Sequence, residues 1–161
     1  MIRIGNGIDV HRFDTEAGDK AIVLGGISIP HTHALLAHSD GDVLTHALMD
    51  ALLGALGLGD IGQHFPDTVE KYRDVSSMSL LDGVMNKVND SGWQLGNADI
   101  TVVAQAPRLS RHIESIKNSL AAGMKVAADL VSVKATTCEG LGFTGRGEGI
   151  AVLATVLLTK P

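Results

Sequence analysis

The amino-acid sequence predicts an α/β protein in which a mixed β-sheet is covered by helices as a two-layer sandwich. Segments rich in β-branched residues alternate with segments whose apolar residues recur at helical spacing. The 161 residues fit one domain of the usual size of about 150 residues, and no repeat or linker divides them. With 45% apolar and 19% charged residues, the composition excludes an intrinsically disordered chain. We therefore expect a single domain over residues 1–161.

The first third of the chain is expected to begin with β structure and to continue into a buried helix. Residues 1–10 alternate as a strand does, and residues 21–29 contain two short apolar runs joined by a Gly-Gly pair, which is typical of a hairpin. A Ser39-Asp40 pair can cap the helix that follows, and glycines after Leu56 can end it. Because apolar residues surround most of this helix, we expect it to lie in the core.

The rest of the chain alternates helices with strands. Helices with one apolar stripe each are expected over residues 76–92 and 110–129. Strands are expected over residues 99–105, 131–137 and 149–159. This order of elements predicts a mixed sheet with covering helices.

Charge and aromatic content argue against nucleic acid as a partner. The net charge is -5 and Phe, Tyr and Trp make up 3% of residues, whereas nucleic-acid binders carry basic clusters and stacking aromatics. No apolar run approaches the roughly 20 residues that span a bilayer, and the N-terminal segment lacks the apolar core of a signal peptide. The lone Cys138 cannot form an internal disulfide, which is typical of a reducing compartment. We expect a cytoplasmic or organelle-matrix protein that binds neither nucleic acid nor membrane.

A candidate metal site combines Asp9 and His11 with His46. Residues at i and i+2 on a strand point to the same side, so Asp9 and His11 can supply two ligands together. Asp42 and Asp50 lie one helical turn from His46, and one of these carboxylates is expected to orient its ring. A solitary histidine is more often a hydrogen-bonded core residue, but this pattern favours a metal. Three such ligands leave one tetrahedral position open, as in a catalytic zinc site.

Three further histidines lack this pattern. His31 and His33 follow a proline in an expected loop, and His112 lies near a helix start among charged residues. We expect all three to be exposed to solvent.

A glycine-rich segment, residues 134–149, is a candidate anion-binding loop. Its G-x-G-x-x-G spacing matches a dinucleotide fingerprint, which we reject because a strand rather than a helix is expected to follow. Backbone N–H groups between glycines and the Arg146 guanidinium can still hold a phosphate. Glu139 would repel that phosphate unless a divalent cation lies between them. The alternative is a tight turn in which Glu139 pairs with Lys134 or Arg146.

Two further segments, residues 59–68 and 104–108, are dense in turn-forming residues. Taken alone, each is typical of an ordinary loop. Exits from strands and helices in α/β proteins nevertheless often form ligand sites.

Seven short segments, spread in order over nearly the whole chain, share one pattern. They are Gly7 to His11, Leu35 to Val43 with His46, Leu58 to Gly62, Phe65 to Thr68, Ala104 to Pro107, Lys134 to Thr137 and Leu141 to Gly149. Together they resemble the 2-C-methyl-D-erythritol 2,4-cyclodiphosphate synthase family of the non-mevalonate isoprenoid pathway. Asn6, Arg108 and Cys138 depart from residues frequent in that family, which bears on local nucleotide contacts.

The resemblance implies a lyase that cyclises 4-diphosphocytidyl-2-C-methyl-D-erythritol 2-phosphate to 2-C-methyl-D-erythritol 2,4-cyclodiphosphate and releases CMP. It implies a homotrimer with active sites between subunits. It also implies Zn²⁺ on Asp9, His11 and His46, and a second divalent cation, Mg²⁺ or Mn²⁺, on Glu139. Because the attacking phosphate is already ionised, no general base is expected.

Roles for the remaining site residues also follow from the resemblance. His38 and Thr137 are expected to be catalytic, and with Ser39 to contact phosphate oxygens in the transition state. Asp60 and Gly62 are expected on the erythritol side. The expected substrate-binding residues are Asp9, His11, His38, Ser39, Asp60, Ile61, Gly62, Phe65, Pro66, Asp67, Thr68, Val69, Ala104, Gln105, Ala106, Pro107, Arg108, Leu109, Ser110, Thr136, Thr137, Cys138, Glu139, Phe143 and Arg146, of which 104–109 and Thr136 would contact the cytidine nucleotide.

Two other functions fit the same residues. A zinc hydrolase would activate water on Asp9, His11 and His46. A non-enzymatic trimer that binds a metal or senses an isoprenoid diphosphate would use Arg146 in an anion pocket on its symmetry axis. The products formed from the cytidylyl substrate distinguish these functions.

Overall fold

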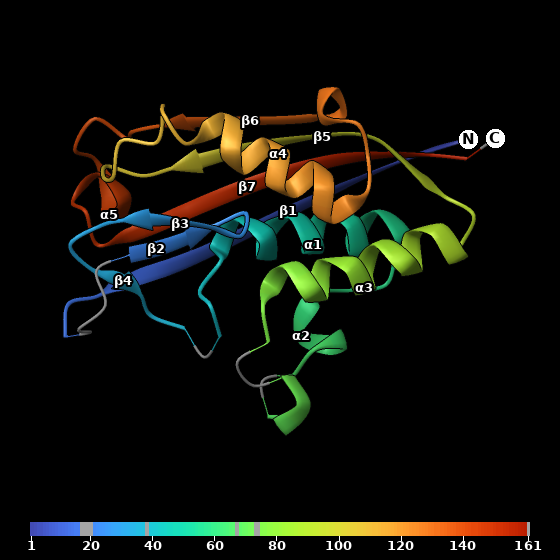
Figure 1. The fold of residues 1–161 in the computed structure, drawn as a ribbon, viewed down its shortest axis with the longest axis horizontal. Coiled ribbons are helices and arrows are strands. Elements are labelled where there is room, and N and C mark those ends of the chain that lie inside the picture. Colours follow the sequence, from blue (N-terminus) through green and yellow to red (C-terminus); the bar gives the residue numbers. More distant parts are fainter. Residues whose placement is uncertain (17–20, 38, 67, 73–74, 161) are drawn as a thin grey trace.

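A five-stranded mixed sheet forms one layer of the protein (Figure 1). The computed structural model describes residues 1–16, 21–37, 39–66, 68–72 and 75–160. The strand order is β4-β1-β7-β5-β6, in which β5 and β6 are parallel and the other neighbours are antiparallel. β2 and β3 form a separate hairpin. The strands are β1 (Ile2–Asp14), β2 (Ala21–Leu24), β3 (Ile27–Pro30), β4 (Ala34–Leu35), β5 (Gln94–Val103), β6 (Val131–Thr136) and β7 (Gly149–Thr159).

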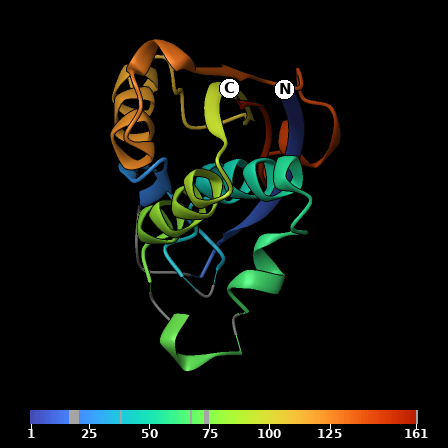
Figure 2. The same ribbon diagram turned by 90° about the vertical axis from the view of Figure 1, so that its right-hand side faces the viewer.

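Three longer helices cover one side of this sheet, α1 (Val43–Leu56), α3 (Ser77–Asp90) and α4 (Ile113–Met124), as Figure 2 shows. α1 packs on β1 and β7, and α4 packs on β6. Buried apolar side chains fill the space between the layers, among them Leu48, Leu52, Leu81, Ile100, Val152 and Val156. The short elements are α2 (Ile61–His64), α5 (Gly142–Gly145) and the 3₁₀ turns Glu70–Tyr72 and Ala128–Leu130. The predicted mixed sheet with covering helices is thus confirmed.

β1 and α1 approach each other closely because β1 has glycine where the helix crosses it. A Cβ atom at Gly7 would lie 2.0 Å from the Ala47 carbonyl oxygen, and one at Gly5 would lie 1.9 Å from that of Ala51. The helix presents small residues at these crossings, so the two backbones are in contact. This close packing brings the middle of β1 next to the first turns of α1.

The opposite face of the sheet carries exposed apolar side chains along β1, with the polar Asn6 between Ile4 and Ile8. Ile2, Ile4, Ile8 and Val10 are between 46% and 65% exposed, and Leu153 on β7 is 48% exposed. Side chains alternate along a strand, so this face is turned away from the helices. In the described chain, these five side chains form an apolar strip that is exposed to solvent.

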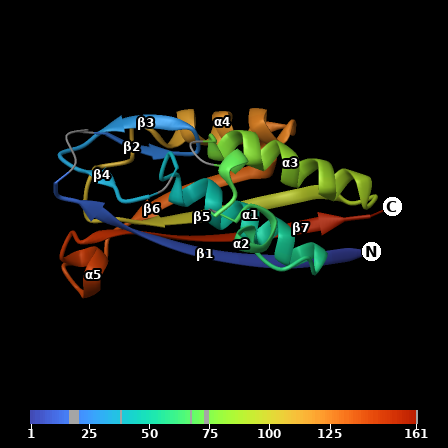
Figure 3. The same cartoon turned by 90° about the horizontal axis from the view of Figure 1, so that it is seen from below.

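The two ends of the described chain lie side by side (Figures 1 and 3). Ile2 pairs with Thr159, and the amino group of Met1 donates to the Lys160 carbonyl at 3.0 Å. The loops after β5 and β6 and the helix α5 lie at the other end of the sheet. No helix among the described residues is long and apolar enough to span a bilayer.

Several predicted boundaries of helices and strands were wrong. α1 begins at Val43 because Gly41 adopts a positive φ of 67°, so its cap is Asp42 rather than Ser39-Asp40. The helix expected over residues 110–129 is shorter, since Lys125 is left-handed at φ 58° and ends α4. The first strand is longer than expected and β5 begins before residue 99. The hairpin, the second helix and the last two strands lie where predicted, within a residue or two.

Candidate metal centre and substrate cavity

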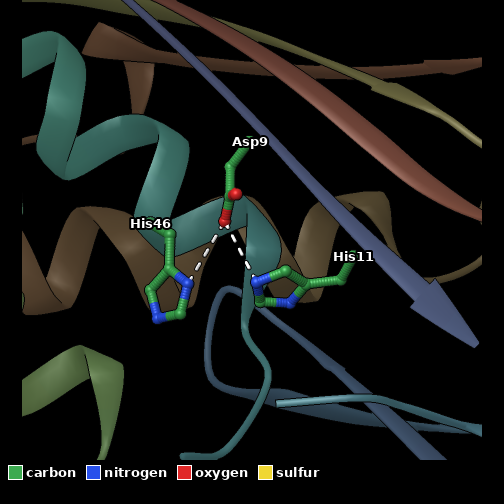
Figure 4. Close-up of side chains that lie close together, drawn as sticks. All are labelled: Asp9, His11 and His46. Atoms are coloured by element: carbon green, nitrogen blue, oxygen red, sulfur yellow. Dashed lines mark hydrogen bonds and ion pairs between the residues drawn. The ribbon is translucent and has the colours of Figure 1, made fainter. Parts of the chain in front are cut away.

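Asp9, His11 and His46 converge between β1 and α1, as the spacing predicted (Figure 4). Asp9 and His11 project from the helix-facing side of β1, and His46 projects from the first turn of α1. Asp9 Oδ2 lies 3.2 Å from His46 Nδ1 and 3.3 Å from His11 Nε2. One ligand atom of each residue lies within 4.8 Å of the other two.

This geometry fits a tetrahedral divalent ion. Zinc bonds of about 2.0–2.1 Å to nitrogen and oxygen place neighbouring ligand atoms roughly 3.3 Å apart at a tetrahedral angle. The two measured separations from Asp9 match that edge length. Two imidazole nitrogens and one carboxylate oxygen also suit zinc, and they leave a fourth position open.

Asp9 and His46 shift each other's pKa in the direction that favours the charged form of each. Burial acts to raise the pKa of Asp9, but the hydrogen bond with His46 and the positive charges of both imidazoles outweigh it and keep this pKa below its usual range. Burial acts to lower the pKa of His46, but Asp9, with the more distant charges of Asp42 and Asp40, raises it above the ordinary value. A proton and a metal ion therefore compete for the same nitrogen of His46.

The hydrogen-bond partner of His46 differs from the one predicted, and His11 has a backbone partner. His11 Nδ1 lies 3.3 Å from the Gly41 carbonyl, and His46 Nε2 lies 2.9 Å from Ser77 Oγ. The prediction that Asp42 or Asp50 orients His46 was wrong.

Both aspartates have other hydrogen-bond partners. Asp42 is fully buried at the start of α1 and accepts from Thr45 and from the backbone of the β2–β3 turn. Asp50 accepts from the Ile61 amide at 2.8 Å and so holds the start of α2. Helical spacing correctly predicted that both aspartates lie near His46. Their carboxylate oxygens, however, accept hydrogen bonds from the start of α1 and from the start of α2.

A cavity of about 1150 Å³ opens beside the metal cluster. It is lined by both histidines of the cluster, of which His11 is also an expected substrate-binding residue, and by six further expected ones, Ser39, Ile61, Gly62, Phe65, Pro66 and Thr68. Sequence analysis missed five lining residues, Leu36, Ala37, Met49, Tyr72 and Leu80. Four of these are apolar, which is also typical of core packing, so no sequence signal distinguished them.

Four other expected residues do not line this cavity or cannot be placed. His38 and Asp67 lie outside the described residues. The Asp60 carboxylate caps α2 by accepting from the Gln63 amide at 3.0 Å. The Val69 amide donates to Pro66 in a turn.

The expected nucleotide residues lie elsewhere, on the loop that follows β5 and at the end of β6. Thr136 is in register with Val103, Val103 with Ala151, and Ala151 with Val10. Three strand spacings therefore separate Thr136 from Val10, or roughly 14 Å. Residues in register share a face, so Thr136 points to the outer face with Val10 while Asp9 and His11 point inward. One chain thus keeps Thr136 and the Asp9, His11 and His46 cluster apart, on opposite faces of the sheet.

The structure contradicts the surface pairing considered for Glu139. Lys134 pairs with Asp99, and Arg146 forms two hydrogen bonds with Glu148. Glu139 instead accepts from Thr137 Oγ1 at 2.6 Å and adopts a left-handed φ of 50°. β7 follows the glycine-rich segment, which confirms the rejection of a dinucleotide fingerprint.

The three histidines expected in solvent are half-buried. His31 stacks on Phe13 with ring centroids 4.7 Å apart, and His33 lies beside it. His112 precedes α4 and is also partly covered. Neighbouring side chains therefore partly cover these three imidazole rings, although their positions in an expected loop or among charged residues predicted full exposure.

Comparisons with known proteins agree with the fold. The YgbB family model matches residues 2–159. The 2-C-methyl-D-erythritol 2,4-cyclodiphosphate synthase of Pseudomonas aeruginosa (strain UCBPP-PA14) is 59% identical over 157 residues, which cover 98% of each chain.

Two solved structures superpose over essentially the whole chain. The bifunctional IspDF from Campylobacter jejuni matches with a TM-score of 0.93 and 45% identity over 100% of this chain, which spans only 43% of that longer protein. The CDP complex of IspF from Plasmodium falciparum matches with a TM-score of 0.86 and 34% identity, covering 99% of this chain and 96% of that one. Together with the family model, these similarities show that the chain belongs to the YgbB family, and that curated relatives 58–59% identical to it are named 2-C-methyl-D-erythritol 2,4-cyclodiphosphate synthase.

Proposed function

We propose that this chain converts 4-diphosphocytidyl-2-C-methyl-D-erythritol 2-phosphate to 2-C-methyl-D-erythritol 2,4-cyclodiphosphate and CMP. An oxygen of the 2-phosphate attacks the β-phosphorus, and the bond from that phosphorus to the bridging oxygen breaks. The bridging oxygen leaves with the electron pair on CMP. The observation that carries this proposal is the Asp9, His11 and His46 cluster beside a cavity that its two histidines line, in a chain of this family.

Phosphoryl transfer of this kind depends on alignment and charge neutralisation more than on covalent chemistry. Asp9, His11 and His46 would hold Zn²⁺, which when bound supplies positive charge to phosphate oxygens. His38 and Ser39 would contact the same phosphate oxygens, Thr137 would contact them from a neighbouring chain, and the cavity beside Phe65 and Pro66 would receive the methylerythritol. The attacking phosphate needs no general base because it is already ionised.

Product analysis tests the reaction directly. Purified protein is incubated with the cytidylyl substrate and Mg²⁺, and the products are separated and quantified. Equal amounts of CMP and cyclic diphosphate are expected. Release of inorganic phosphate instead would favour a zinc hydrolase, and binding without turnover would favour a sensor.

A second divalent cation, Mg²⁺ or Mn²⁺, is proposed on Glu139. The carboxylate lies next to Thr137, and the nearby cations Lys134 and Arg146 are engaged by other acids. One carboxylate is too few ligands to dehydrate Mg²⁺, so the ion is expected only with a diphosphate bound.

Glu139→Gln is therefore expected to reduce CMP release by about 10²- to 10³-fold, the usual cost of losing one group that stabilises transition-state charge. Its zinc content should equal that of the parent, because different residues hold the two ions. Turnover is measured against Mg²⁺ concentration, with Glu114→Gln in the exposed first turn of α4 as the matched control. Identical Mg²⁺ curves for the parent and Glu139→Gln would contradict the bridging cation.

A homotrimer with shared active sites is also proposed. Support comes from the roughly 14 Å and the sheet layer that separate the metal cluster from Thr136, since a substrate that contacts both must lie between two chains. The exposed apolar strip on β1 supplies a surface that an assembly would bury. Sedimentation equilibrium should give three times the 16.8 kDa chain mass, and a monomer at micromolar concentration would refute the assembly.

Localisation in the cytoplasm or an organelle matrix is part of the proposal, supported by the single cysteine.

A further inference from the structure

A chain of two hydrogen bonds runs from His46 away from the metal cluster. His46 Nε2 lies 2.9 Å from Ser77 Oγ, and Ser77 Oγ lies 2.6 Å from Asp40 Oδ1. Ser77 is the first residue of α3 and is fully buried, and Asp40 lies in the loop before α1. Three separate segments of the chain therefore meet behind the ring.

The neighbours of Asp40 determine the direction of these hydrogen bonds. Its Oδ2 accepts from the Ser77 amide at 2.8 Å, and its Oδ1 accepts from the Asp42 amide at 3.3 Å. Both oxygens of Asp40 thus act as acceptors, so the single hydroxyl proton of Ser77 points toward Asp40. The Ser77 oxygen then has only lone pairs to offer, and it accepts from His46 Nε2–H. In a neutral His46 the other nitrogen, Nδ1, is left unprotonated where it faces Asp9 and His11.

We infer that Ser77 and Asp40 are positioning residues that keep His46 protonated at Nε2 and so keep Nδ1 ready for the metal. The inference rests on the proposed metal site and adds the residues that prepare it. Histidines that bind metals usually donate their other N–H to a carboxylate or a carbonyl, which fixes the ring and strengthens the ligand. Here a hydroxyl lies between the imidazole and the carboxylate.

Asp40 also connects the His46 ring, through Ser77, with the loop that lines the substrate cavity. Ser76, the cap residue of α3, makes no side-chain capping bond, and Asp40 accepts from the first helical amide instead. The neighbouring residue Ser39 lines the cavity. One carboxylate therefore fixes the start of α3, the loop that carries Ser39, and, through Ser77, the metal-facing ring.

Zinc affinity of purified variants tests the inference without relying on turnover. Dissociation constants are measured by competition with a fluorescent chelator for the parent, Ser77→Ala, Asp40→Asn and the double variant. Each single variant should bind zinc about 10- to 100-fold more weakly. The double variant should be little worse than either single one, because both act through the same hydrogen-bond chain.

Thr45→Val is the matched control. Thr45 is fully buried on α1, and its hydroxyl donates to Asp42 Oδ2 at 2.8 Å, so the substitution removes a similar hydrogen bond without touching the ring. It should lower stability as Ser77→Ala does and leave zinc affinity within about twofold. Equal losses of zinc affinity in Thr45→Val and Ser77→Ala would assign Ser77 a purely structural role and overturn the inference.

A measurement on the parent protein decides the matter if the variants do not fold. Two-bond ¹H–¹⁵N spectra of the zinc-loaded parent should show the His46 proton on Nε2 and the metal on Nδ1. A proton on Nδ1, or zinc affinity unchanged by Ser77→Ala, would overturn the inference while leaving the metal site standing. A parent that takes up no zinc would instead refute the metal site itself, and this inference with it.

Discussion

Replacing His46 by alanine is expected to remove the metal from the protein and to abolish CMP release. His46 supplies one of three ligand atoms that lie within 4.8 Å of one another, and the two that remain cannot complete a zinc site. The loss of affinity should exceed the roughly 10- to 100-fold that accompanies loss of an outer hydrogen-bond partner. CMP release should fall by at least about 10²- to 10³-fold, since charge on the reacting phosphates is then uncompensated.

Zinc per chain is measured by mass spectrometry after dialysis, alongside CMP release. His112→Ala is a suitable control, because His112 lies before α4 and outside the cluster, and it should keep its zinc. A His46→Ala protein with the full zinc content of the parent would remove His46 from the ligand set.

Gly7→Ala should destabilise the fold itself. The new Cβ would lie 2.0 Å from the Ala47 carbonyl oxygen and 2.7 Å from the Ala51 amide, and backbone atoms of a buried helix cannot move aside as a flexible side chain can. Overpacking of this kind costs about 1–3 kcal/mol or more. The strand and the helix must separate, and with them Asp9 and His46, so zinc affinity should fall together with the free energy of unfolding.

Gly83→Ala provides the control for that substitution. Gly83 lies in the middle of α3, and a Cβ there would meet no atom within 4 Å. Alanine should raise the free energy of unfolding by about 0.5–1 kcal/mol, because it favours the helical backbone. Urea denaturation of the three proteins gives the comparison, and a Gly7→Ala midpoint at or above that of the parent would refute the close-packing argument.

Local spacing was enough to predict part of the site. Asp9 and His11 share a strand face and His46 lies on a regular helix, so period and residue type revealed all three residues of the possible metal site. The link between Asp40 and Ser77 spans 37 residues and exists only because α3 packs beside α1, which no spacing rule encodes. Asp42 illustrates the converse error: its helical distance from His46 was right, but its oxygens cap α1 instead.

The elements of the fold that depend on local sequence features were also predicted better than those that do not. The hairpin and β7 were predicted closely because glycine turns and β-branched runs are local features. The start of α1 and the end of α4 depend on single residues with left-handed backbones, Gly41 and Lys125, and lysine carries no sequence mark for that conformation.

The adjacent ends of β1 and β7 make this domain easy to insert into or attach to other polypeptides. Both chain ends leave the sheet on the side away from α5 and the loops after β5 and β6 (Figure 1). A fusion partner, an affinity tag or a surface tether placed at either end would therefore extend away from those loops. A short linker could also join the ends directly, because Ile2 and Thr159 already pair across the sheet, and new ends could then be opened elsewhere to give a circular permutant.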